Sequence, residues 1–103
     1  MFRTTIIKTS PELTFSTPQE FVAELENYFD SEHYNNAVNN CIASGKILNI
    51  TESLDDSKTL RTVFDWDSED SYIEFFVNSN NLESYVTAIE AAGYTRTTTT
   101  ETI

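Results

Sequence analysis

Two alternating runs of residues around a short polar turn constrain the fold of this 103-residue chain more than any other feature. The first run is Lys46 to Leu54 and the second is Thr59 to Trp66. Their alternating apolar residues are Leu48, Ile50 and Leu54, then Leu60, Phe64 and Trp66. The turn between them, Asp55-Asp56-Ser57-Lys58, is composed of residues that favour tight turns. The pattern predicts an antiparallel β-hairpin in the middle of the chain.

Helical signals precede this hairpin. Thr17 can cap a helix that starts at Pro18, with Glu20 as the reciprocal partner of a capping box. The apolar period that follows changes phase near Asp30-Ser31, so we expect two helical pieces, the second ending at Gly45. The apolar positions of the two pieces are Phe21, Val22, Leu25, Tyr28 and Phe29, then Tyr34, Ala37, Val38, Cys41 and Ile42.

A second helical region follows the hairpin. Asp67-Ser68-Glu69-Asp70 supplies a cap and acidic residues for a first helical turn. Gly93 closes the helix, which an Asn/Ser-rich interruption at Asn78 to Asn81 divides. Its apolar positions are Tyr72, Ile73, Phe75, Phe76, Leu82, Tyr85, Val86 and Ile89.

Strand-prone segments form the two ends of the chain. Phe2 to Thr9 is rich in β-branched residues, and Tyr94 to Ile103 contains a run of threonines. The element order is therefore β-α-β-β-α-β, which predicts an α+β, ferredoxin-like domain with a four-stranded antiparallel sheet and helices on one face. We expect one domain spanning residues 1–103.

The free face of such a sheet predicts a homodimer. The hairpin has apolar residues in both alternating sets, because Ile47 and Val63 fall opposite to the main apolar set. A monomer would expose such a patch, so we expect a twofold interface through the sheet face.

The charge balance limits the possible partners. Six basic and 17 acidic residues give a net charge of −11 and a pI near 4.2. A chain that binds nucleic acid or an anionic membrane needs clustered Lys and Arg, so we expect neither partner. Cys41 alone cannot form an intrachain disulfide, and the N-terminus has no apolar run typical of a signal peptide, so we expect a cytoplasmic protein.

The segment from Gly45 to Gly93 resembles the antibiotic-biosynthesis-monooxygenase-like family. The resemblance lies in an alternating strand that ends near Trp66, a short acidic or serine cap at 67–69, and a helix that carries Tyr72, Phe75 and Phe76. It implies a dimeric α/β barrel with a pocket between the sheet and the helices of each subunit. Some members oxidise aromatic substrates without a metal or flavin, and others degrade haem. The haem-degrading pattern is absent here, since Phe75 and Tyr85 stand where that pattern has tryptophan and histidine.

The most informative candidate site is aromatic. One strand and one helix carry the residues that we predict to line a ligand pocket: Phe64, Trp66, Tyr72, Phe75, Phe76 and Tyr85. Core packing or a dimer interface explains the same pattern.

The other reactive residue types favour structural roles. His33, the single histidine, lacks the converging ligands of a metal site and is expected at the surface. Cys41 lies on an apolar stripe and is expected in the core. Asp65 and Asp67 form a possible carboxylate pair, although capping and solvation explain them more simply. We therefore expect no metal and no cofactor.

Three functional hypotheses remain open at this point. The first is an uncharacterised dimeric protein that binds a small apolar molecule between sheet and helices. The second is a cofactor-independent monooxygenase, which needs a polar group such as Arg61, Arg96 or Asn49 near the aromatic residues. The third is an acidic protein-interaction module or nucleic-acid mimic, suggested by the charge.

Overall fold

A computed structural model describes the backbone of residues 1–77 and 81–103, and the side chains of 1–77 and 84–103. Along the chain the elements are β1 (Phe2–Thr9), α1 (Pro18–Leu25), α2 (Glu32–Ala43), β2 (Ile47–Asp56), β3 (Thr59–Trp66), α3 (Glu69–Tyr72), the π-helix η1 (Ile73–Val77), α4 (Asn81–Ala91) and β4 (Thr95–Thr102). Apart from Asn81, the predicted interruption at Asn78 to Asn81 lies outside the described residues, as does the side chain of Leu82.

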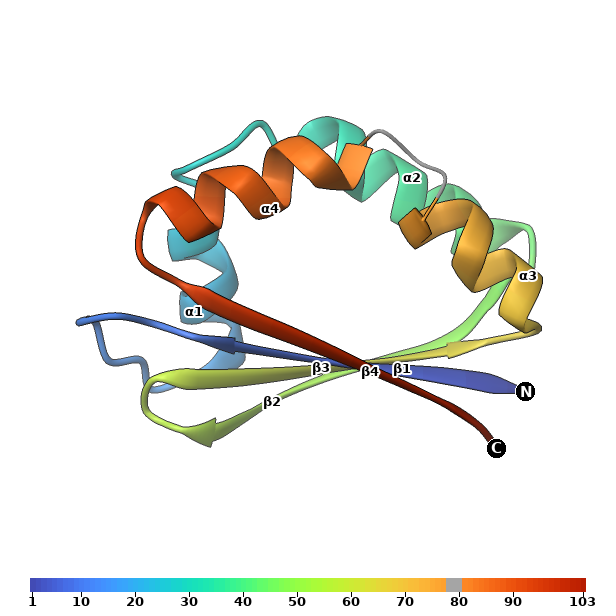
Figure 1. Ribbon diagram of the computed structural model, residues 1–103, viewed down its shortest axis with the longest axis horizontal. Coiled ribbons are helices and arrows are strands. Elements are labelled where there is room, and N and C mark those ends of the chain that lie inside the picture. The colour runs from blue at the N-terminus through green and yellow to red at the C-terminus, as the bar shows by residue number, and fades with distance from the viewer. Residues whose placement is uncertain (78–80) are drawn as a thin grey trace.

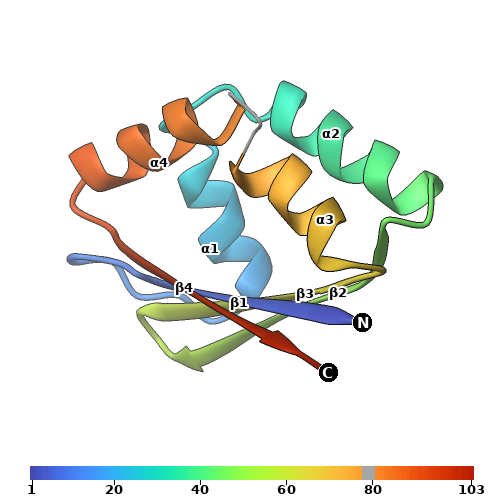
Figure 2. The same ribbon diagram turned by 45° about the vertical axis from the view of Figure 1, so that its right-hand side comes forward.

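The four strands form one antiparallel sheet in the order β2-β3-β1-β4. The helices lie together over one face of this sheet, and the other face is uncovered (Figures 1 and 2). This is the ferredoxin-like α+β fold that the element order predicts.

Local signals place the helices where the sequence predicts them. Thr17 caps α1, its Oγ1 accepting a hydrogen bond from the backbone N–H of Glu20 at 3.2 Å. Ser68 caps α3 through the N–H of Ser71 at 3.3 Å. Gly45 and Gly93 end the two helical regions with φ of +77° and +94°, in the left-handed region that glycine enters without strain.

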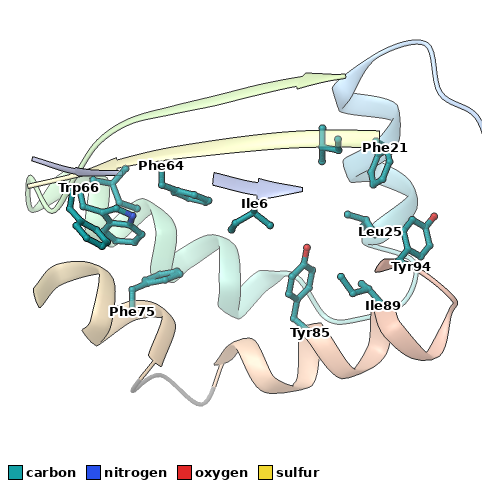
Figure 3. Close-up of a cluster of buried hydrophobic side chains, with 12 residues drawn as sticks. Ile6, Phe21, Leu25, Phe64, Trp66, Phe75, Tyr85, Ile89 and Tyr94 are labelled. Carbon is teal, nitrogen blue, oxygen red and sulfur yellow. The ribbon is translucent and has the colours of Figure 1, made fainter. Parts of the chain in front are cut away.

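The core lies between the helices and the covered face of the sheet. Figure 3 shows its side chains pointing inward from both layers. The buried apolar residues are Phe2, Ile6, Phe21, Leu25, Ile47, Leu60, Phe64, Trp66, Phe75, Tyr85, Ile89 and Tyr94.

The prediction that Ile47 and Val63 share the second sheet face is wrong for Ile47 and holds for Val63. Ile47 pairs with Trp66 and is buried, because a register shift between Ile47 and Asn49 turns it toward the helices. Leu48, expected to lie with Ile50 and Leu54, is the unpaired residue at this shift and is 51% exposed. The pairing and alternation leave Ile7 and Val63 as apolar side chains on a face that is otherwise dominated by threonines.

Candidate functional site

The six predicted aromatic residues occupy two regions that meet at Phe64, whose ring stacks on Trp66 with centroids 5.7 Å apart. Phe64 and Tyr85 line a pocket between the sheet and the helices. Trp66, Tyr72, Phe75 and Phe76 form a packed aromatic cluster at one end of the core, with ring centroids 5.6–6.1 Å from that of Trp66. Phe75 also borders a separate hollow next to α2.

The pocket has a volume of about 170 Å³ and receives side chains from both layers. Its apolar and aromatic walls are Val22, Leu25, Phe29, Tyr34, Val38, Ile50, Phe64 and Tyr85; its polar lining consists of Lys8, Glu26, Ser31, Asn35, Glu52 and Thr62. The site therefore combines mainly apolar walls with a few polar groups, which is typical of small-molecule sites.

Tyr85 is at the centre of this arrangement. Its ring stacks on Tyr34 with centroids 5.4 Å apart and meets Phe29 edge-on at 4.4 Å. Figure 3 shows it projecting from α4 toward the sheet. The Nζ atom of Lys8 lies 4.9 Å from the centre of the same ring. Tyr85 of the helix layer is therefore in contact with a buried amine of the sheet.

Lys8 is the unexpected member of the site. It follows Phe2, Thr4 and Ile6 on the covered face of β1 and is 8% exposed. Burial, helped by the charge of Arg96 and opposed by Glu52, lowers the pKa of Lys8 from 10.5 to about 7. The amine is therefore partly neutral near physiological pH. Sequence reasoning gave Lys8 no role, although the alternation places it on the same face of the strand as Phe2 and Ile6.

Burial also changes the acidity of the surrounding groups. It raises the pKa of Tyr34 to about 12, and it raises the pKa of Tyr85 still further. Both phenols stay protonated at neutral pH and can donate hydrogen bonds. The pKa of Glu52 is raised by partial burial and lowered by Lys8, with burial the larger effect.

The polar candidates for oxygenase chemistry lie in different places. Arg61 lies on the uncovered face and binds Asp55 at 2.9 Å. Asn49 lies on the same face, paired with Asp65. Arg96 pairs with Lys8 across β1 and β4, and its Nε is buried without a hydrogen-bond acceptor. Of these three residues, Arg96 is the one whose charge affects the pKa values of the pocket residues Lys8 and Tyr85.

The remaining candidate residues, His33, Cys41 and Asp65, lie in environments that do not favour catalysis or metal binding. His33 is exposed in the first turn of α2. Cys41 is half-buried against the core, and burial raises the pKa of its thiol, which opposes nucleophilic reactivity. Asp65 forms a two-pronged ion pair with Arg3 at 2.7 and 3.1 Å, which lowers the pKa of its carboxyl. It is thus engaged with Arg3 and not with Asp67.

Two kinds of site find no support in the described part of the chain. No group of three or more His, Cys, Asp or Glu side chains there is arranged to hold a metal ion. Within the same residues, no helix has the length and apolar character needed to cross a membrane.

Comparison with known proteins supports the assignment of the fold. No family model matches the chain, and no curated protein matches it in sequence. Among solved structures, the chain is similar over 100% of its length to the crystal structure of a dimeric ferredoxin-like protein from an uncultured marine organism. The match covers 94% of that chain, with a TM-score of 0.53 and 14% sequence identity. At this identity the likeness shows the fold alone, and that fold is ferredoxin-like.

Proposed function

We propose that this protein binds a small, largely apolar molecule in the pocket between its sheet and helices. The observation that carries the proposal is the pocket of about 170 Å³, walled mainly by aliphatic and aromatic side chains. An engineered apolar cavity of about 150 Å³ is large enough to bind benzene. A ligand with one aromatic ring, or an aliphatic body of that size, therefore fits here.

Titration with benzyl alcohol, followed by two-dimensional NMR, tests this proposal. We expect saturable shifts at pocket residues such as Phe29 and Tyr85. Val38→Phe places extra volume in the pocket wall and should abolish those shifts, whereas Val77→Phe, at a 63% exposed position, should leave them unchanged. Shifts that do not saturate, or that persist in Val38→Phe, would refute binding at this site.

We also propose that two copies pair through the uncovered sheet face to form a dimeric α/β barrel. The similar solved structure is described as dimeric. The charge on this face is compatible with self-association, because two arginines there offset part of the charge of four acids in a chain of net charge −11: Arg3 and Arg61, with Asp55, Asp56, Asp65 and Glu101. This partial neutralisation reduces like-charge repulsion between copies that meet through this face. Ile7 and Val63 supply apolar contact.

Light scattering after size exclusion tests the pairing. We expect a mass of twice 11.7 kDa, reduced to one copy by Ile7→Glu on the uncovered face. Val77→Glu adds the same charge at an exposed position in the helix layer and should leave the dimer intact. A single-copy mass for the unmodified protein at micromolar concentration would contradict the proposal.

Kinship with the antibiotic-biosynthesis-monooxygenase-like family is part of the same proposal. It is supported by the element order and by the succession of Trp66 at the end of β3, the Ser68 cap, and the aromatic residues of α3 and η1.

A further inference from the structure

Two cations lie next to each other on the covered face of the sheet. Lys8 on β1 and Arg96 on β4 are directly opposite in the antiparallel pairing. Cross-strand partners project to the same side, and Lys8 shares its side with the buried Phe2 and Ile6. Both positive side chains therefore extend toward the helix layer, where Lys8 lines the pocket.

Neither cation has an ionic partner among the residues whose side chains are described. The three ion pairs found there join Arg3 to Asp65, Lys46 to Glu74, and Arg61 to Asp55. The Nε of Arg96 is buried without an acceptor. The contact of the Lys8 amine is the face of the Tyr85 ring. Buried positive groups are normally paired, yet the buried Lys8 and the half-buried Arg96 have no ion-pair partner in this part of the chain, and Glu52 acts on Lys8 only through its charge.

The charged and titratable groups around Lys8 come from every neighbouring element. They are Glu26 after α1, Tyr34 on α2, Glu52 on β2, Tyr85 on α4 and Arg96 on β4. Glu26 is exposed at the solvent side of the pocket, whereas Glu52 is partly buried and acts on Lys8 through its charge without forming an ion pair with it. The two phenols are protonated, which makes them hydrogen-bond donors. The inner part of the pocket thus presents donors and positive charge.

We propose that the ligand of this pocket is a small monocarboxylic acid, with its apolar body against Phe29, Val38 and Phe64 and its carboxylate bound by Lys8 beside Arg96. The inference rests on the proposed binding function and specifies the ligand class. A carboxylate supplies the missing acceptor, and charge-assisted hydrogen bonds of this kind are strong in a pocket with little water. The pocket volume limits the body to about one ring.

Proton uptake accompanies this binding. The Lys8 amine has a pKa of about 7 without an anion beside it, and a bound carboxylate favours its protonated form. Carboxylate affinity should therefore be nearly constant below pH 7 and fall as the pH rises above it. A neutral ligand of the same shape gains nothing from the proton and should show no such dependence.

Calorimetric titration with benzoate and with benzyl alcohol, at pH 6 and pH 8.5, tests the inference. At pH 6 we expect benzoate to bind at least about tenfold more tightly than benzyl alcohol. Between pH 6 and pH 8.5 benzoate should weaken by about ten- to thirtyfold, while benzyl alcohol stays constant. Benzoate is ionised at both values, so this change reports on the protein.

Substitutions distinguish the contributions of Lys8 and Arg96 to benzoate binding. Lys8→Met keeps the side-chain length, removes the amine, and should abolish both the preference for benzoate and its pH dependence. Arg96→Gln should weaken benzoate and move the pH dependence to higher pH, because the charge of Arg96 helps to lower the pKa of Lys8. Lys58→Met and Arg61→Gln remove the same charges at exposed positions and should leave both properties unchanged.

The outcomes distinguish this inference from the function on which it rests. If benzyl alcohol binds and benzoate binds no better, the carboxylate inference fails and the binding function stands. If neither compound binds, the proposed function fails and the inference fails with it. An unchanged benzoate preference in Lys8→Met would also overturn the assignment.

Discussion

The buried amine of Lys8 should make the stability of this protein depend on pH in a direction that is easy to recognise. Unfolding returns the amine to water, where its pKa is 10.5, from a folded state where its pKa is about 7. Between these values the unfolded chain binds a proton that the folded chain does not bind. The free energy of unfolding therefore rises with pH in this window, and the Lys8 contribution is lost as the pH falls toward 7.

The size of the effect follows from the same two values. From pH 6 to pH 9, about two pH units lie above the folded-state pKa, and each unit contributes about 1.4 kcal/mol, so the expected gain is about 3 kcal/mol. The Lys8→Met variant has no amine at this position, so its unfolded chain does not bind this proton. Since all other ionisable groups are shared, the stability of the unmodified protein relative to Lys8→Met should increase by this amount.

Urea denaturation followed by circular dichroism at pH 6 and pH 9 measures the difference. Lys58→Met is the matched control, because it removes a lysine from the exposed turn between β2 and β3, and it should show no comparable change relative to the unmodified protein. A stability difference between the unmodified protein and Lys8→Met that is equal at both pH values would refute the reasoning. It would mean that the folded state leaves the amine hydrated.

Three further predictions test the packing and the helix ends. Trp66→Ala removes a fully buried indole from the aromatic cluster and should lower the free energy of unfolding in urea by about 3–5 kcal/mol. Gly93→Ala should destabilise the protein by about 1–2 kcal/mol and by more than Gly45→Ala: both have positive φ, but only the Cβ at 93 would lie 3.2 Å from Pro11 Cγ, so equal thermal midpoints for the two variants would contradict the geometry. Thr17→Ala removes the cap of α1 and should cost about 1 kcal/mol in thermal or urea unfolding, whereas Thr17→Ser should be close to neutral.

The predictable part of the fold is the part specified by local signals. The alternation of Leu60, Phe64 and Trp66 defines β3 and its covered face, and both helical regions end at a glycine with positive φ. These signals depend on neighbouring residues only, so a single sequence is enough to interpret them.

The mistaken sheet face has a nonlocal cause. Strict alternation places Leu48 with Ile50 and puts Ile47 on the opposite side. The register shift between Ile47 and Asn49 places Ile47 on the covered face instead, and it arises from the pairing of β2 with β3 rather than from either strand alone. A bulge of this kind moves one side chain from one face to the other without a sequence signature that a single chain reveals.

The prediction of the candidate site was incomplete for a different reason. Aromatic residues on β3, α3, η1 and α4 suggested one pocket lining, but of these residues Phe64 and Tyr85 line the pocket, whereas the others pack around Trp66, which Phe64 also contacts. Lys8 went unnoticed because β1 has an isoleucine on each face, at positions 6 and 7, and the alternation alone does not show which face is covered.

The position of Lys8 links stability to binding. The chain has 17 acidic residues, yet none of those whose side chains are described lies within ion-pair distance of this amine. Folding therefore costs free energy at pH values where the amine would be charged, and a hydrophobic residue at this position would avoid that cost. A carboxylate that enters the pocket restores the proton to Lys8 and stabilises the folded state in the same step. The stabilisation by benzoate should accordingly be larger at pH 6 than at pH 8.5, which is the opposite of the pH trend in the unliganded protein. That reversal distinguishes a binding amine from a lysine that is merely buried.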